Sequence, residues 1–166
     1  MMRNAATRVF GVGFALLALL LVPGCLDESV VEPTPVAIER LNPANAGTYS
    51  GMLKPIRAVV RDAVTFENLW KAAWTFTPAP AVPEVDFATH VVLVVALGEQ
   101  GSGGYAIQVA EVVSEGYGLR ALVHSTAPGS GCAVTTALTQ PVEFVGVAAK
   151  GAAIRFVEEQ DITPCK

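Results

Sequence analysis

The chain has 166 residues and a formal net charge of −4; 52% of its residues are hydrophobic and only 16% are charged. This composition provides no basic surface, so it excludes a nucleic acid as the expected partner. The length suffices for one modest domain with its own core. The abundance of Val, Ala and Gly favours a β-rich exported domain over a charged helical one.

The first 24 residues predict a secretory signal peptide. They begin with a short basic segment, which contains Arg3 and Arg8 and no acidic residue. An almost unbroken apolar run follows from Val9 to Val22. A basic start, a short apolar core and a small residue before the cleavage point are typical of an exported chain. The run is also shorter than the roughly 18–20 residues that span a bilayer.

The segment Leu21-Val22-Pro23-Gly24-Cys25 resembles the lipobox of bacterial lipoproteins. The resemblance implies that the thiol of Cys25 is diacylated, that the chain is cut before this residue and that the new amino terminus is acylated. Two or more acyl chains hold a protein stably on a membrane, at about 0.8 kcal/mol per buried methylene. We therefore expect a mature chain of formal charge −6, anchored by lipid in the cell envelope. The alternative is an ordinary signal peptide followed by an unmodified cysteine.

The residue after Cys25 bears on which membrane holds the anchor. It is Leu26, and not the aspartate that often retains lipoproteins at the inner membrane. This favours the outer membrane, on its periplasmic or surface face. Residues 25–35 contain acidic residues, Ser and prolines, and they predict a tether between the anchor and a domain that covers residues 36–166.

The first part of the domain predicts two strands and a helix. A short strand is expected at 36–41, a turn at 42–47 and a second strand at 52–61. Thr65 is the predicted N-cap of a helix from Phe66 to Trp74. The apolar residues of that helix recur at helical spacing and predict one buried face: Phe66, Leu69, Trp70, Ala73 and Trp74. The two tryptophans could line a ligand cleft, but the commoner role is to anchor a helix on a sheet.

From residue 85 onward the periodicity becomes that of strands. The continuous apolar run at 90–97 predicts a strand covered on both faces. A hairpin-like glycine-rich loop is expected at 98–104, followed by strands at 105–113 and 119–125. The segments 142–147 and 154–158 predict a hairpin around Lys150-Gly151. The expected fold is α+β and mainly β, a single small β-sandwich or open barrel of about seven strands with one helix.

Cys132 and Cys165 remain as a pair once Cys25 is assigned to the anchor. In an oxidising compartment two cysteines in a small domain most simply form a disulfide, which would tie the C-terminal tail to a Gly- and Pro-rich loop. The alternative is two free thiols. A metal site is not expected, because the two cysteines are far apart in sequence and have no histidine nearby.

From about Phe66 onward the order of features resembles the C-terminal domain family of the protease complex subunit PrcB. The resemblance rests on Phe66-x-x-Leu69-Trp70, on Val85-Asp86-Phe87 before an apolar strand, and on the segment from Val91 to Ile107 with Ser102-Gly103-Gly104-Tyr105. It implies a lipoprotein that associates with a protease complex at the cell surface. The family supplies no established catalytic residues.

No set of residues predicts catalysis, a metal site or a cofactor. The two histidines are His90 and His124, and Ser125 directly follows the second. Neighbours in a strand point to opposite faces, so His124 and Ser125 do not form a simple dyad. The glycine-rich loop enters a strand and not a helix, which argues against a phosphate-binding loop and for a tight turn with positive φ. We therefore expect a non-enzymatic protein.

The same loop is the predicted contact surface for a partner. Its candidate residues are Gly98, Ser102, Gly103, Gly104 and Tyr105. A glycine-rich loop on a rigid frame can approach the backbone of a partner at low ordering cost. The expected function is a membrane-anchored, non-catalytic module that binds or assembles another envelope protein, with a protease complex as one setting. Two alternatives remain: a protease inhibitor, since the loop is similar to one binding loop of chagasin-type inhibitors, and a structural or carbohydrate-binding lipoprotein.

Overall fold

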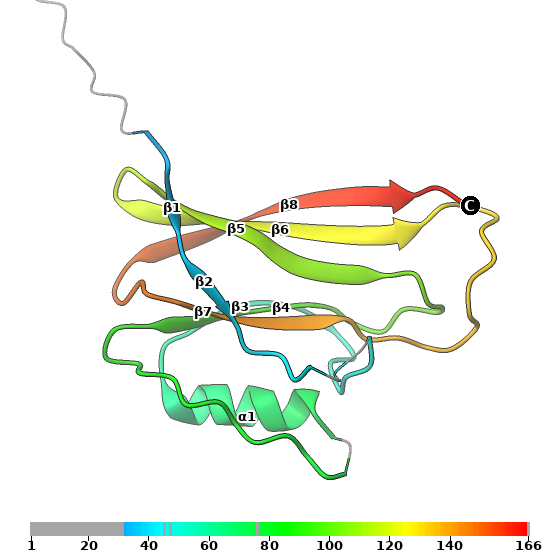
Figure 1. Ribbon diagram of the computed structural model, residues 1–166, viewed down its shortest axis with the longest axis horizontal. Coiled ribbons are helices and arrows are strands. Elements are labelled where there is room, and N and C mark those ends of the chain that lie inside the picture. Colours follow the sequence, from blue (N-terminus) through cyan, green and yellow to red (C-terminus); the bar gives the residue numbers. More distant parts are fainter. Residues whose placement is uncertain (1–31, 45, 47, 76, 166) are drawn as a thin grey trace, which may run out of the picture. The chain divides into compact units, whose positions relative to one another are not determined.

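The computed structural model describes residues 32–165, except residues 45, 47 and 76. Two four-stranded sheets pack face to face, and helix α1 (Ala63–Ala73) covers the free face of one of them (Figure 1). The predicted signal peptide and the predicted anchor Cys25 lie outside the described residues.

The sheet that carries no helix, here called the outer sheet, has the strand order β1-β5-β6-β8, and the middle sheet has the order β2-β7-β4-β3. Paired strands are antiparallel, except that β6 and β8 are parallel. The predicted mainly β sandwich is confirmed, with eight strands in the described part of the chain and no closed barrel. The strands are β1 Thr34–Val36, β2 Ile38–Arg40, β3 Pro55–Val60, β4 Val91–Leu97, β5 Ala106–Glu115, β6 Gly118–Pro128, β7 Val142–Val147 and β8 Ala153–Thr163.

The middle sheet is buried on both faces. On one face Val94 and Phe144 belong to the core beneath α1, together with Phe66 and Trp70 of the helix. On the other face the side chains of β4 and β7 pack against the outer sheet. Residues 91–96 are consequently buried at every position, which confirms the predicted strand with two covered faces.

Helix α1 begins three residues before its predicted start. Its N-cap is Asp62, whose Oδ1 accepts the backbone N–H of Thr65 at 2.8 Å. The prediction of Thr65 as the N-cap is therefore wrong; Thr65 lies in the first turn and donates to the cap. A carboxylate is preferred at this position because it accepts an orphan amide and also carries charge opposite to the positive end of the helix.

The predicted apolar face of α1 is confirmed as a packing surface. Phe66, Trp70, Trp74 and Phe144 form a cluster of aromatic rings with centroid separations of 5.3–6.2 Å. The indole of Trp70 also donates from Nε1 to the Pro80 carbonyl at 3.3 Å. Both tryptophans are 2% exposed, so they anchor the helix and offer no platform for a ligand.

The first predicted strand, at 36–41, is divided between the two sheets. β1 pairs with β5 in the outer sheet and, one residue later, β2 pairs with β7 in the middle sheet. The chain therefore crosses the edge of the sandwich at residue 37. Because Thr34 and Pro35 already belong to β1, the predicted tether ends two residues earlier than expected.

Two connections predicted as hairpins cross between the sheets instead. β4 and β7 pair with each other in the middle sheet, and each already has a second neighbour, so β5 and β8 join the outer sheet. The hairpin of 142–147 with 154–158 is therefore wrong. β8 pairs with β6 in parallel, from Gly118 with Ala153 to Pro128 with Thr163, and this pairing extends both strands beyond their predicted ends.

A buried carboxylate links the two sheets. Glu143 on β7 is 8% exposed, and its Oε2 accepts the backbone N–H of Val109 at 2.5 Å. Its Oε1 pairs with Arg40, whose Nη2 donates to the Val109 carbonyl at 3.3 Å. β1 pairs with β5 only at residues 112–114, and a β-bulge follows Val109. β1 does not extend as far as Val109. The side chains of Glu143 and Arg40 therefore form the hydrogen bonds that the Val109 backbone would otherwise make with a neighbouring strand.

We predict that Asp62→Ala lowers the thermal midpoint by about 2–4 °C, because the first turn of α1 loses its cap. The hydrogen bond from Thr65 holds the pKa of Asp62 below its usual range. This contribution to stability is complete above the unfolded-state pKa of about 3.9, and it is lost as the pH falls through the lower folded-state pKa. The difference in midpoint between wild type and Asp62→Asn, measured by calorimetry, should change between about pH 5 and pH 2; a difference independent of pH would contradict the role of the charge.

We predict that Glu143→Ala lowers the free energy of unfolding by about 3 kcal/mol, because it leaves the buried Val109 amide without a partner and removes the ion pair with Arg40. The matched control is Glu67→Ala, which removes an exposed i,i+4 pair with Lys71 on α1 and should cost at most about 0.5 kcal/mol. Urea denaturation of the two variants measures both values. Equal costs would show that the buried carboxylate contributes no more than a surface one.

Candidate functional site

Four segments meet at one end of the sandwich, at the end marked C in Figure 1. They are residues 48–53, 98–105, 129–141 and 162–165, here called the loop end. Hydrogen bonds join them in pairs: the Glu99 amide donates to Leu53 O at 3.2 Å, the Gln140 amide to Thr48 O at 2.8 Å and the Gly129 amide to Thr163 O at 2.9 Å. The loop end is therefore one assembled surface and not a set of separate loops.

The predicted partner-binding loop is held by the segment that precedes β7. Gln100 and Thr139 exchange two backbone hydrogen bonds, of 2.8 and 3.1 Å, and form an isolated antiparallel bridge. The Thr139 hydroxyl donates to Ser102 O at 2.8 Å, and the Gly103 amide donates to Thr135 O at 3.0 Å. These bonds hold the loop in one conformation, so that little entropy is left to lose on binding.

Two of the predicted loop glycines adopt a positive φ, as the predicted tight turn requires: Gly98 at +75° and Gly104 at +90°. A Cβ at Gly98 would also lie 2.9 Å from the backbone of Lys54. By contrast, a Cβ at Gly103 would closely meet only the hydroxyl oxygen of Thr135, at 2.4 Å, and a Cβ at Gly101 would meet nothing within 4 Å. Position 101 thus faces open space.

The C-terminal tail closes the other side of the loop end. Cys132 and Cys165, the predicted pair, lie with their Sγ atoms 2.00 Å apart and their Cα atoms 5.1 Å apart, as a disulfide. Beside it lies a cavity of about 290 Å³, which includes Gly104 of the glycine-rich loop. Its other lining residues are Pro128, Cys132, Ala133, Val134, Thr163, Pro164 and Cys165.

Exposed apolar side chains gather at the loop end. Seven large apolar side chains are exposed in the part of the chain that the structure describes, and five of them belong to its segments. Single exposed apolar residues are ordinary, whereas a group of them on one surface is typical of an interaction site. The five are Tyr49, Leu53, Val134, Leu138 and Ile162.

The structure brings the predicted loop residues together with residues that the sequence analysis missed. Gly98 is buried, Ser102, Gly103 and Tyr105 are half-buried, and Gly104 is exposed. The exposed apolar surface comes instead from other segments, such as Leu138 at 52% exposure. Its sequence signal was a lone leucine within the polar stretch Thr135-Thr136-Ala137-Leu138-Thr139-Gln140.

The two histidines have partners other than a nucleophile. His124 Nε2 lies 2.9 Å from Asp161 Oδ2 on the outward face of the outer sheet, and the adjacent Ser125 is buried and donates to Glu159 O at 3.3 Å. His90 Nδ1 lies 2.7 Å from the hydroxyl of Thr89. The sequence argument that His124 and Ser125 point to opposite faces is confirmed.

Within the described residues, no three His, Cys, Asp or Glu side chains converge in a way that could hold a metal ion. Within the same part of the chain, no helix combines the length and apolarity that a membrane crossing requires.

Comparison with known families matches residues 91–148 to the family described as PrcB C-terminal. The match covers 58 of the 166 residues, about a third of the chain. It runs from β4 through β7 and includes both the glycine-rich loop and residues 129–141 of the loop end. The predicted resemblance is confirmed for the segment from Val91 to Ile107, whereas Phe66 to Trp70 and Val85 to Phe87 lie outside the match. The comparison with curated proteins gave no significant match, and neither did the comparison with solved structures.

The family is named for a subunit of a protease complex, and its C-terminal domain is not known to be catalytic. The match includes two of the four segments of the loop end, residues 98–105 and 129–141. Two of the five exposed apolar side chains, Val134 and Leu138, lie within it, and Tyr49, Leu53 and Ile162 lie outside it.

We predict that replacing both cysteines, Cys132→Ser with Cys165→Ser, lowers the free energy of unfolding by about 2–4 kcal/mol, because the unfolded chain loses a long cross-link. In the folded state the loss of restraint should be local. Amide hydrogen exchange should accelerate in residues 129–134 and 162–165 and stay unchanged in β4 and β7. Unchanged exchange in the tail would show that the disulfide does not order the loop end.

Proposed function

We propose that this protein is a lipid-anchored, non-catalytic envelope protein whose PrcB C-terminal domain binds another envelope protein through the loop end. Acylated Cys25 serves as the anchor, in the outer membrane, and the partner belongs to a protease complex. The observation that carries the proposal is the gathering of five exposed apolar side chains on the loop end.

The rigidity of the loop end supports the proposal. Binding costs less when the contacting segments are already ordered, and here hydrogen bonds and a disulfide hold all four segments together. The middle of an interface is typically apolar, with polar groups at the rim. Leu138 and Val134 supply apolar groups, and the side chains of Glu99 and Gln140, joined by a 3.2 Å hydrogen bond, supply polar ones.

A second candidate is a protease inhibitor that acts through the glycine-rich loop. The observation in its favour is that the loop is rigidly held while position 101 faces open space. A rigid loop that a protease cannot distort is a common means of inhibition. Gly101→Glu adds bulk and charge there, so it should abolish inhibition of a papain-like protease if this second candidate is correct.

We predict that Leu138→Asp reduces recovery of the partner by about tenfold, the effect expected when a charge replaces an apolar contact at the centre of an interface. The experiment uses the full chain with an affinity tag in native cells, and it quantifies envelope proteins that co-purify after solubilisation in mild detergent. The matched control is Tyr117→Asp, since Tyr117 is also a fully exposed apolar residue but lies at the β5–β6 turn.

Retention of one partner by Tyr117→Asp and its loss by Leu138→Asp is the expected result. Equal recovery from both variants would contradict the assignment of the loop end. Cys25→Ser tests the anchor in the same cells, because the variant should leave the membrane fraction. If Cys25→Ser stays with the membranes, the proposal of lipid attachment at this residue is wrong. The test of the loop end by Leu138→Asp does not depend on that result.

A further inference from the structure

Most of the cations in the described residues are neutralised by carboxylates. Five of the eight Lys and Arg residues there form ion pairs. The three that form none are Lys54, Arg61 and Lys150. Arg61 and Lys150 line one cavity, and His90 lines it with them. No carboxylate belongs to the lining of this cavity. Three basic side chains therefore share one cavity in a chain of net charge −4, and the proposed function gives them no role.

The cavity has a volume of about 490 Å³ and lies where the chain crosses from β7 to β8. Three separate segments supply its basic groups: the residue after β3, the residue before β4 and the β7–β8 connection. Phe87 and Val91 add an apolar part to the lining. The complete lining is Arg61, Phe87, His90, Val91, Lys150, Gly151, Ala152 and Ala153.

Hydrogen bonds fix these segments to one another. Arg61 Nη2 donates to Ala152 O at 2.7 Å, which directs the guanidinium across the β7–β8 connection. The Lys150 amide donates to Thr89 O at 3.2 Å and brings Lys150 beside the turn that carries His90. An arginine with one N–H group engaged in this way keeps further donors for a ligand.

The orientation of the His90 ring follows from its neighbours. The Thr89 hydroxyl donates its single proton to Asp86 Oδ2 at 2.8 Å, so His90 Nδ1, 2.7 Å from that hydroxyl, must be the donor of their hydrogen bond. The other ring nitrogen, Nε2, is then the one left for a ligand. Hydrogen bonds from Thr89 and from the Ala88 amide, together with the charges of His90 and Lys150, hold the pKa of Asp86 below its usual range.

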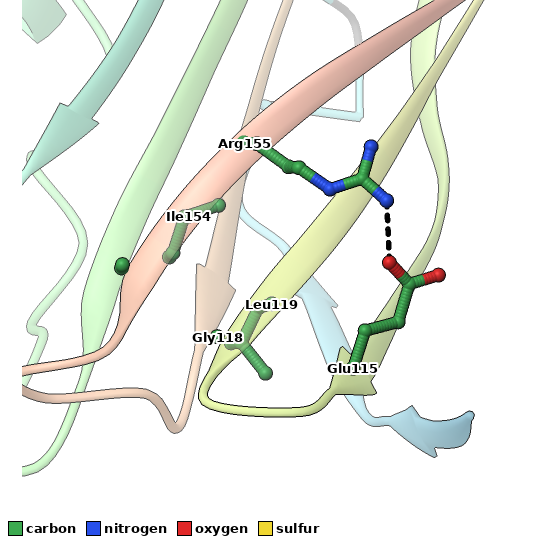
Figure 2. Close-up of a pocket in the computed structure, with 6 residues that line it drawn as sticks. Glu115, Gly118, Leu119, Ile154 and Arg155 are labelled. Carbon is green, nitrogen blue, oxygen red and sulfur yellow. Dashed lines mark hydrogen bonds and ion pairs between the residues drawn. The ribbon is translucent and has the colours of Figure 1, made fainter. Parts of the chain in front are cut away.

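A second cavity at the outer sheet shows the contrasting case. It has a volume of about 240 Å³, and Figure 2 shows Arg155 directed at Glu115 on its rim. Glu115 also accepts from Arg120 Nε at 2.7 Å. The charges of this cavity satisfy one another and leave no need for a ligand of opposite sign.

We propose that the cavity of Arg61, His90 and Lys150 binds a phosphate group. Arg61 and Lys150, which belong to two separate segments, bring several donors to one cavity. Such a set suits a tetrahedral oxyanion, which presents several oxygens, better than a planar carboxylate, which presents two. Lysine acts on phosphate as a point charge, and arginine supplies a fork of donors. The apolar side chains beside the basic groups accommodate an organic part attached to the phosphate.

The phosphate can come from a soluble molecule or from a lipid headgroup. β1 begins at the end of the sandwich that carries this cavity, since Thr34 pairs with Ser114 next to the β5–β6 turn, and Gly118 of that turn pairs with Ala153 of the lining. The chain that leads back to Cys25 therefore leaves the domain at this end. The lipid source rests on the proposed anchor; the phosphate site itself does not.

The test is a titration of the full chain, in maltoside micelles free of phosphate, with inorganic phosphate. The readout is the NMR signals of the His90 ring. Wild type should bind saturably at one site, and the double variant Arg61→Gln with Lys150→Gln should bind about tenfold more weakly or not at all. The matched control is Lys54→Gln, which removes the third unpaired cation outside the cavity and should bind as wild type does. Circular dichroism confirms that each variant is folded.

The proposal would be overturned if the NMR shifts of the His90 ring in wild type rose linearly with phosphate concentration and did not saturate. Equal affinities for phosphate in all three proteins would overturn it as well. Acetate that binds as tightly as phosphate would also overturn it. sn-Glycerol 3-phosphate distinguishes the sources: tighter binding than inorganic phosphate supports a lipid headgroup, and weaker binding supports a soluble phosphate. Leu138→Asp should bind phosphate as wild type does, so failure of this proposal and failure of the proposed function give different results.

Discussion

The burial of the middle sheet on both faces is the constraint on which the rest of the structure depends. Val91 to Ala96 present apolar side chains in alternation to α1 and to the outer sheet, so the sheet is stable only when both are in place. The same constraint explains the topology. Once β4 and β7 lie side by side between β2 and β3, the strands that follow them must enter the outer sheet. Glu143 is the buried acid of this layer, and Arg40 with the Val109 backbone makes its burial tolerable.

This layering determines where the protein can present functional groups. Both faces of the middle sheet are covered, and the outward face of the outer sheet carries charges that largely pair with one another, such as Arg120 with Glu111 and Glu115. The crossings between the sheets lie at the two ends. One end gathers apolar side chains on segments held by hydrogen bonds and a disulfide; the other gathers Arg61, His90 and Lys150. The two ends therefore suit different partners: a protein surface at the loop end and a phosphate group at the other.

Local patterns predicted the parts of the fold that depend on burial. The apolar run of β4 and the spacing of Phe66 and Trp70 identified the buried sheet and the helix face, because burial leaves a period in the sequence. Pairings between distant residues left no such trace. Arg40 and Glu143 are 103 residues apart, and the parallel pairing of β8 with β6 depends on sheet order and not on any short motif. The glycine-rich loop was placed correctly in the chain, but the apolar surface beside it comes from isolated residues such as Leu138, which only the assembled loop end brings together.

The most direct test of the account is site-specific photo-crosslinking in native cells, with a crosslinking residue placed singly at 138, at 157 and at 117. Position 138 lies in the loop end, 157 in β8 of the outer sheet and 117 at the β5–β6 turn. The account predicts one specific crosslinked envelope protein from position 138 and none from the other two. Crosslinks to such a protein from position 157 or 117, with none from 138, would contradict the claim that the loop end is the binding surface.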